Sequence, residues 1–287
     1  MKKVLAAVDN SSAGRGVIAS ARALAALLDA GVEVLYVRVD GDRTVRQAAE
    51  AAGLELRIAE GPVVERLIKE GAADDVVALV VGTRRSHAAR RALGRTAAAV
   101  ATQLPKPILI VPPDADPAPV FRRVLVPIEG SVSSSLAPRT VFELAAGAEI
   151  DAVALHVYDE SSVPAFTDQP QHEQPAWEDE FLHRYCPWGL ASVRLETRVG
   201  RSGESISRAA EECGCDLIAL GWSQELSGGR APVVREVLEL SSRPVLLVPV
   251  RSAIDSRDTT TARNSGGAEQ HAFSPSGVSP FEGGTNP

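Results

Sequence analysis

One pattern of residues occurs twice in the chain and constrains its fold more than any other feature. In each copy, an apolar run ends at a glycine, and a loop and a helix-length segment lead to a second apolar run that is flanked by proline. The first copy spans Val76–Pro112, and the second runs from Leu217 to Pro249. Continuous runs of Val, Ile and Leu are typical of strands buried on both faces of a parallel sheet, and parallel strands need a crossover connection.

The preceding parts of the two copies also correspond. Val4–Ser11 and Val124–Ser131 each describe a buried strand that ends at an acidic residue, a turn former and a serine. Each copy continues with a helix, a second strand, a variable segment, a third strand and a short helix, predicted at Gly14–Leu28, Val32–Val39, Asp40–Gly53, Leu54–Ile58 and Pro62–Glu70 and again at Leu136–Ala146, Ile150–Val157, Tyr158–Leu190, Val193–Val199 and Glu204–Glu212. Strands that alternate with helices in this way predict an α/β fold of two tandem doubly wound five-stranded parallel-sheet domains, each Rossmann-like.

Composition divides the chain into two domains and a tail. We expect the first domain over residues 1–113, a stiff Pro-rich linker over 114–120 and the second domain over 121–250. The second domain carries an insertion near 158–190, which we expect to be helical around Trp177–Tyr185. Residues 251–287 have few apolar side chains and predict a disordered tail.

The last strand of each domain, Ile108–Val111 and Val245–Val248, is bare and apolar. An unpaired apolar edge strand is prone to aggregation. We therefore expect these two strands to pair with each other across a pseudo-two-fold axis, which would make the chain an internal pseudo-dimer.

Charge and cysteine usage exclude several classes of function. The formal net charge of −7 argues against nucleic acid as a partner. No apolar run approaches the length of a membrane span, and the N-terminus enters a strand without a signal-peptide core. Three cysteines are too few for a disulfide framework, so we expect a cytoplasmic protein.

The ordered set of motifs resembles the universal stress protein family. The resemblance rests on the first-strand signatures Val8–Ser11 and Ile128–Ser131, the strand ending Leu155-His156-Val157, and the runs Cys215–Gly221 and Arg243–Pro249. It covers nearly all of residues 1–250 as two tandem copies. The resemblance implies an adenine nucleotide alpha hydrolase-like fold and a possible adenine nucleotide, such as ATP, as ligand.

In ATP-binding members of this family, the loop after the fourth strand reads Gly-x2-Gly-x9-Gly followed by Ser or Thr. Glycines allow backbone N–H groups to approach phosphates, and the following helix N-terminus contributes its dipole. In the first copy, Gly82 and Gly94 match the pattern, whereas Arg85 stands at the second glycine and Arg95 at the hydroxyl position, with Thr96 next to it.

The second copy departs further from this pattern. It retains Gly221, has Gln224 at the second glycine, and places Ala231-Pro232 where Gly-Ser is expected. Gly228-Gly229 would lie out of the family register. The resemblance therefore implies a degenerate phosphate loop in both copies.

On the base side of the implied site, Asp9 and Val39 match base-contacting positions in the first copy, and Glu129 and Val157 are the weaker candidates in the second. Asp9 has two interpretations: it contacts a ligand, or it forms an Asx turn or helix cap beside Ser11-Ser12. Gly82 and Gly221 likewise serve phosphate approach or a simple turn.

Other candidates are weaker. A cluster of arginines either binds phosphate or forms a solvated helix face; its members are Arg84, Arg85, Arg90, Arg91 and Arg95. His172, His183 and Cys186 do not have the spacing of a zinc site, and Cys213-Gly214-Cys215 is one residue short of a dithiol motif. Trp222 either covers the second cleft or packs in the core.

No set of residues predicts a catalytic or metal site. We therefore expect a non-enzymatic stress-response or regulatory module in which nucleotide binding is weak or lost, with a small anion as a further possible ligand. One alternative is an ATP-binding switch that uses the first-domain site. The other is a nucleotide hydrolase or nucleotidyl transferase, which rests on fold analogy alone.

Overall fold

The computed structural model describes residues 1–11, 13–39, 41–85, 91–115, 119–129, 147, 150–158, 170–185, 193–225 and 231–249. The helix expected at 136–146 and the expected tail at 251–287 lie outside these residues. Of Arg84, Arg85, Arg91 and Ala92, and of 170–172 and 174, only the backbone is described.

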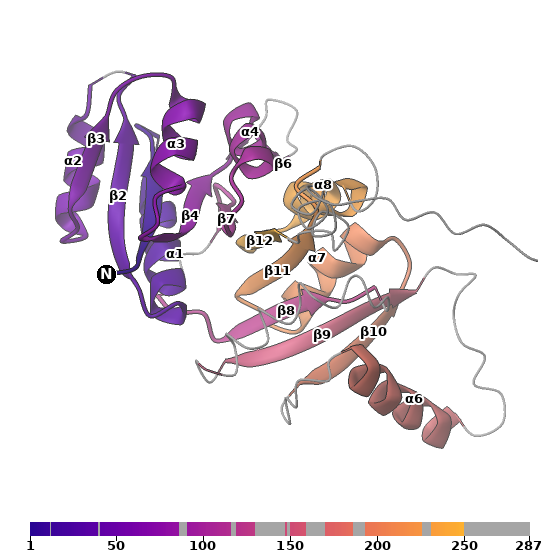
Figure 1. Cartoon of the computed structure of the whole chain (residues 1–287). Coiled ribbons are helices and arrows are strands. Elements are labelled where there is room, and N and C mark those ends of the chain that lie inside the picture. Colours follow the sequence, from indigo (N-terminus) through magenta and orange to yellow (C-terminus); the bar gives the residue numbers. More distant parts are fainter. Residues whose placement is uncertain are drawn as a thin grey trace, which may run out of the picture. The chain divides into compact units, whose positions relative to one another are not determined.

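Five strands and three helices follow one another in the same order in both halves of the described chain (Figure 1). The first half consists of β1 (Lys3–Val8), α1 (Gly14–Leu27), β2 (Gly31–Val37), α2 (Arg43–Ala51), β3 (Leu56–Ala59), α3 (Val63–Gly71), β4 (Val76–Gly82), β5 (Arg84–Arg85), β6 (Arg91–Ala92), α4 (Arg95–Gln103) and β7 (Ile108–Val111). The described second half consists of β8 (Arg123–Pro127), β9 (Asp151–Tyr158), α6 (Pro170–Tyr185), β10 (Arg194–Val199), α7 (Ser202–Glu212), β11 (Leu217–Trp222), α8 (Ala231–Leu240) and β12 (Val245–Pro249).

One ten-stranded sheet runs through both halves in the order β10-β9-β8-β11-β12-β7-β4-β1-β2-β3. Each half contributes five parallel strands, and the two orders mirror each other about the contact between β12 and β7. Those two strands pair antiparallel, with Leu246 opposite Leu109. The α/β fold class and the expected pairing of the last strands are confirmed.

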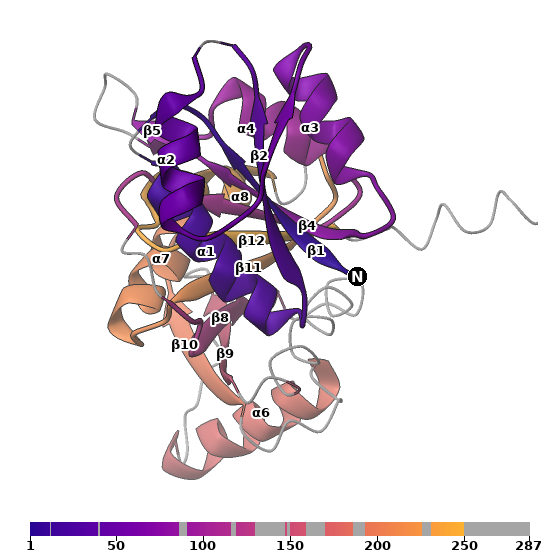
Figure 2. The same ribbon diagram turned by 90° about the vertical axis from the view of Figure 1, so that its left-hand side faces the viewer.

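Helices cover both faces of this sheet, as continuous apolar strands require. Alternate residues of β1 point to opposite faces: Val4 and Ala6 belong to one buried cluster and Leu5 to the other. Residues of α1, α2 and α6 belong to the first cluster, and residues of α3, α4, α7 and α8 belong to the second. Figure 2 shows α1 and α2 on one side of strand β2 and α3 on the other. Contacts between residues join Met1–Val250 into one compact unit. This unit is not divided at 114–120, so the predicted linker there stays a prediction.

The structure adds elements that the sequence pattern did not predict. Helix α2 occupies part of the segment 40–53, which we described only as variable, and α6 begins seven residues before Trp177, the predicted start. A short hairpin, β5–β6, lies within the loop after β4. In the part of the chain that the structure describes, no helix is long and apolar enough to span a membrane.

Candidate functional site

A large cavity lies at the carboxyl ends of the first-half strands, where ligands bind in doubly wound sheets. Its volume is about 540 Å³, and residues that follow β1, β2 and β4 line it together with α1, α3 and the start of α4. Six of the seven first-domain candidates line this cavity: Asp9, Val39, Gly82, Gly94, Arg95 and Thr96. The seventh, Arg85, lies in β5, and its side chain is outside the described residues.

Asp9 forms the Asx turn that was one of its two interpretations. Its Oδ1 accepts a hydrogen bond of 2.9 Å from the backbone N–H of Ser11. The turn does not remove Asp9 from the cavity lining. The hydroxyl of Ser11 also lies in this lining, and its Oγ is buried without a hydrogen-bond partner.

Two residues that the sequence analysis missed shape the same end of the cavity. The side-chain amide of Asn10 donates hydrogen bonds to the Tyr36 hydroxyl oxygen (3.1 Å) and to the Gly41 carbonyl (2.6 Å). The Tyr36 hydroxyl itself donates to Gly41 over 3.3 Å. These bonds hold the loop after β2 against the loop after β1. The available signal was a tyrosine near the end of a largely apolar strand, since a buried hydroxyl usually finds a partner.

The strand register changes which valines correspond. Leu35 of β2 pairs with Ala7, and Leu155 of β9 pairs with Pro127, so the first-half counterpart of Val157 is Val37. Val37 is buried and lines the cavity, whereas Val39 is 69% exposed at its rim. Treating Val39 and Val157 as matching positions was therefore wrong, because the strand ends two residues earlier than Val39.

Gly82 has a packing role. A Cβ at this position would lie 3.0 Å from Cγ2 of Val17 in α1, a contact closer than side chains normally make. The absence of a side chain therefore allows α1 to approach β4. Next to it, the hydroxyl of Thr83 is buried and donates to the Val111 carbonyl at 3.3 Å.

The opposite end of the cavity is the start of helix α4. Gly94 is the N-cap residue and makes no side-chain capping bond, and no acidic residue occupies the first turn. The first residues of the helix, Arg95, Thr96 and Ala97, line the cavity. N–H groups in a first helical turn lack intrahelical acceptors and favour anions. This end of the cavity therefore suits a phosphate group.

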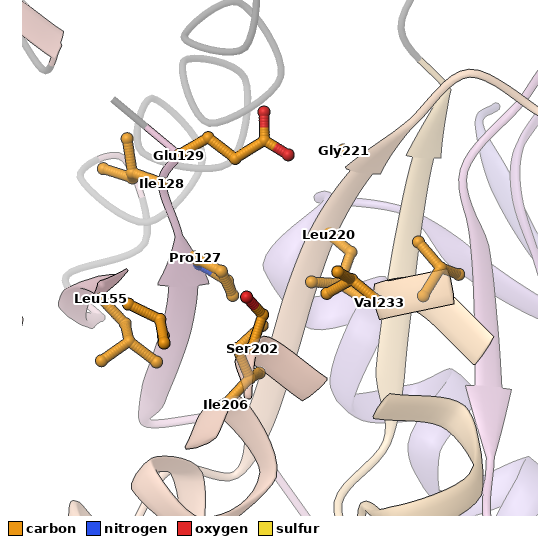
Figure 3. Close-up of a pocket in the computed structure, with 11 residues that line it drawn as sticks. Pro127, Ile128, Glu129, Leu155, Ser202, Ile206, Leu220, Gly221 and Val233 are labelled. Carbon is orange, nitrogen blue, oxygen red and sulfur yellow. The ribbon is translucent and has the colours of Figure 1, made fainter. Parts of the chain in front are cut away.

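The second cavity lies at the corresponding place in the second half but has a volume of only about 70 Å³ (Figure 3). The three weaker candidates, Glu129, Val157 and Gly221, are among the residues that line it. Figure 3 shows the carboxylate of Glu129 at the end of its strand and Ser202 and Ile206 entering from α7. Most of the lining is apolar, and the cavity is too small for a nucleotide within the described residues.

The register explains part of this difference. Gly82 pairs with Val111 and Gly221 with Val248, so Gly94, Arg95 and Thr96 correspond to Ala231, Pro232 and Val233. A proline has no N–H and a valine has no hydroxyl. The start of α8 thus lacks two donors that the start of α4 has.

Among the described residues, the remaining candidates form no further site. His183 bonds through Nδ1 to the Asp179 carbonyl, and the described residues contain no group of His, Cys, Asp and Glu that could hold a metal. Cys186 lies outside those residues, as does the side chain of His172. Cys215 is fully buried, and burial raises the pKa of its thiol to about 12. Trp222 is buried in the core.

The arginine cluster is only partly visible. Arg90 and the side chains of Arg84, Arg85 and Arg91 lie outside the described residues. Arg95 is exposed and lines the rim of the first cavity, so it satisfies both interpretations, a solvated helix face and a position beside a phosphate.

Fold and cavities together define a class: a tandem α/β protein with a cavity at the carboxyl ends of its parallel strands. The profile of the universal stress protein family matches residues 42–112 and 121–249, well over half of the chain. The chain belongs to the universal stress protein family, as the motif order indicated. Comparison with curated proteins found no match.

Solved structures share this fold across both halves. A universal stress protein from Archaeoglobus fulgidus DSM 4304 is 18% identical, with a TM-score of 0.62 over 86% of this chain and 98% of its own. A protein of unknown function from Pseudomonas aeruginosa PAO1 is 11% identical, with a TM-score of 0.63 over 92% and 98%.

An Archaeoglobus fulgidus universal stress protein in complex with dAMP is 16% identical and matches 44% of this chain and 97% of its own, with a TM-score of 0.33.

Proposed function

We propose that this chain is a non-enzymatic regulatory protein that binds one adenine nucleotide, and that it does so in the first-half cavity. The observation that carries the proposal is the asymmetry between the two cavities, about 540 Å³ against about 70 Å³. Ligand sites in proteins usually measure about 300–1,000 Å³. Only the first cavity reaches this range and ends at a helix N-terminus with a neighbouring hydroxyl.

The orientation of the nucleotide follows from the chemistry of the two ends. Asp9 and the buried Val37 offer a carboxylate and an apolar surface to a base, whereas Arg95, Thr96 and the first N–H groups of α4 suit phosphates. In this placement the base lies beside β1 and β2 and the phosphates lie at α4. The dissociation constant should be modest and sensitive to salt, because Arg95 is exposed and exposed charges are screened over about 8 Å at physiological ionic strength.

Titration calorimetry of the whole chain with ATP, AMP and pyrophosphate, at low and high salt, tests the proposal. We expect one nucleotide per chain, affinity that falls with salt, and weaker binding in an Asp9→Ala variant. The matched control is Glu129→Ala, the same position in the other half, which should bind as the unmodified chain does. Two sites, no site, or equal losses in both variants would contradict the proposal. Chromatography of the incubated nucleotide, showing ADP or AMP formed from ATP, would contradict the non-enzymatic part alone.

A further inference from the structure

The loop after β11 reaches from the second half to a helix of the first half. The side-chain amide of Gln224 donates hydrogen bonds to the carbonyl of Leu104 (2.7 Å) and to the carbonyl of Ala101 (3.2 Å). These two carbonyls belong to the last turn of α4 and to its C-cap residue. In the family pattern the position of Gln224 is a phosphate-loop glycine, so the side chain at this position serves a different contact.

The recipient carbonyls depend on an external donor. In a continuing helix the carbonyl of Ala101 would accept the N–H of residue 105, but that residue is Pro105, which has none. Ala101 and Leu104 are both fully buried, so water cannot replace the missing donor. Buried carbonyls without partners destabilise a fold. The Gln224 amide therefore completes the C-terminus of α4.

The backbone of Gln224 is held in an unusual conformation to make this contact. Its φ is +63°, in the left-handed region, and it is one of two described residues other than glycine with a positive φ. Such a conformation costs free energy in a residue with a side chain, and it persists where the surroundings enforce it. Here the two hydrogen bonds from the Gln224 side chain to α4 and its C-cap residue hold this conformation.

A second contact across the halves accompanies the first. Strand β6, in the loop of the first half that corresponds to the loop of Gln224, lies against α8. Each half thus sends its loop after the fourth strand to the closing helix of the other half.

Helix α4 connects this contact to the first cavity. It has nine residues, so its two ends move together as one short rigid element. Its last turn receives Gln224, and its first turn lines the phosphate end of the cavity. The geometry points to Gln224 as a positioning residue for phosphate binding in the first half, supplied by the second half through α4. This inference rests on the function proposed above.

Three variants and one control test it. Gln224→Glu keeps the size of the side chain but cannot donate, and Gln224→Ala removes the amide altogether. Gln224→Gly removes the amide while relieving the positive φ, which separates hydrogen bonding from backbone strain. Ser223→Ala is the matched control, since Ser223 is the exposed neighbour in the same loop.

The probes are ATP, pyrophosphate and adenosine, titrated into the folded full-length chain. We expect Gln224→Glu and Gln224→Ala to weaken ATP and pyrophosphate binding roughly three- to tenfold, the effect of about one hydrogen bond, and Gln224→Gly to behave like Gln224→Ala. Adenosine affinity should stay unchanged, because the base end does not involve α4. A merely structural role would lower all three affinities together or none, and either result would overturn the inference.

Amide hydrogen exchange keeps this inference separate from the proposed function. Without any ligand, the Gln224 variants should exchange faster over residues 95–104, and Ser223→Ala should not. If the unmodified chain binds none of the probes, the proposed function fails. The exchange result alone then tests the link from Gln224 to α4. Unchanged exchange over residues 95–104 would overturn it.

Discussion

Exchanging residues between the two helix starts tests the site where the halves differ most. The double variant Arg95→Pro, Thr96→Val gives α4 the residues Pro232 and Val233 from the first turn of α8. It removes the backbone N–H and the guanidinium of Arg95 and the hydroxyl of Thr96 from the cavity lining. Hydrogen bonds to a charged group contribute about 1.5–3 kcal/mol each, so losing even two of these donors should cost about 3 kcal/mol or more, on the order of a hundredfold in ATP affinity.

The helix itself should survive this exchange. Proline is favoured in the first turn of a helix, where its missing N–H has no intrahelical acceptor. Helix α8 contains Pro232 at this place and is formed. Circular dichroism and the melting temperature should therefore match those of the unmodified chain, and adenosine should bind with unchanged affinity. An Arg95→Ala variant isolates the charge of the arginine side chain, and a Thr96→Val variant isolates the hydroxyl.

The refuting result is specific. If the double variant folds normally and binds ATP as tightly as the unmodified chain, the phosphates do not lie at the start of α4. The assignment of the cavity ends would then be wrong.

Two further predictions concern the second half. Burial lowers the pKa of His156 below its ordinary value, while its Nδ1–H donates to the Ile128 carbonyl at 2.8 Å. His156 therefore takes up a proton more readily in the unfolded chain, so the free energy of unfolding should fall as pH drops through about 6.5. Denaturant unfolding at several pH values should show a smaller fall for His156→Phe than for the unmodified chain. Equal falls in the two proteins would contradict this prediction. A Cβ on Gly203 would lie 2.5 Å from side-chain atoms of Glu236 in α8, so Gly203→Ala should lower the free energy of unfolding by about 1–3 kcal/mol; an unchanged denaturant midpoint would contradict it.

The strands and their order could be predicted because their signal is local and repeated. Helices cover both faces of the strands at Val76–Val81 and Ile108–Val111. These runs must therefore be apolar, whatever the sequences of the loops between them. The pairing of the two last strands followed from the same residues, since neither carries charges that would protect an edge. The outer strands β3 and β10 differ: they carry ion pairs such as Arg57–Glu70 (3.1 Å) and Arg198–Glu196 (3.0 Å).

The contacts between loops could not be predicted in the same way. The bonds of Asn10 with Gly41 and Tyr36 depend on how two loops meet in space, and sequence spacing does not encode this. The equivalence of Val37 and Val157 follows from the strand register, because a family motif matched to the sequence alone can shift by two residues along a strand. In both cases the sequence shows the residue types but not which residues lie beside them in space.

The positions of proline in α4 and α8 connect the cavity with the contact between the halves. In α4 the first turn keeps its N–H groups, whereas Pro105 removes a donor beyond the last turn. In α8, Pro232 removes a donor in the first turn, whereas the residue that corresponds to Pro105 is Ser242, which keeps its N–H.

A loop that bound phosphate in the second half would need small residues close to the ligand, and Gln224 could not then extend toward α4. Under the proposed function, the missing N–H of Pro232 makes the start of α8 the poorer phosphate site, and the loop of Gln224 contacts α4 instead. On this argument, restoring glycine at 224 should not restore nucleotide binding in the second half while Pro232 and Val233 remain.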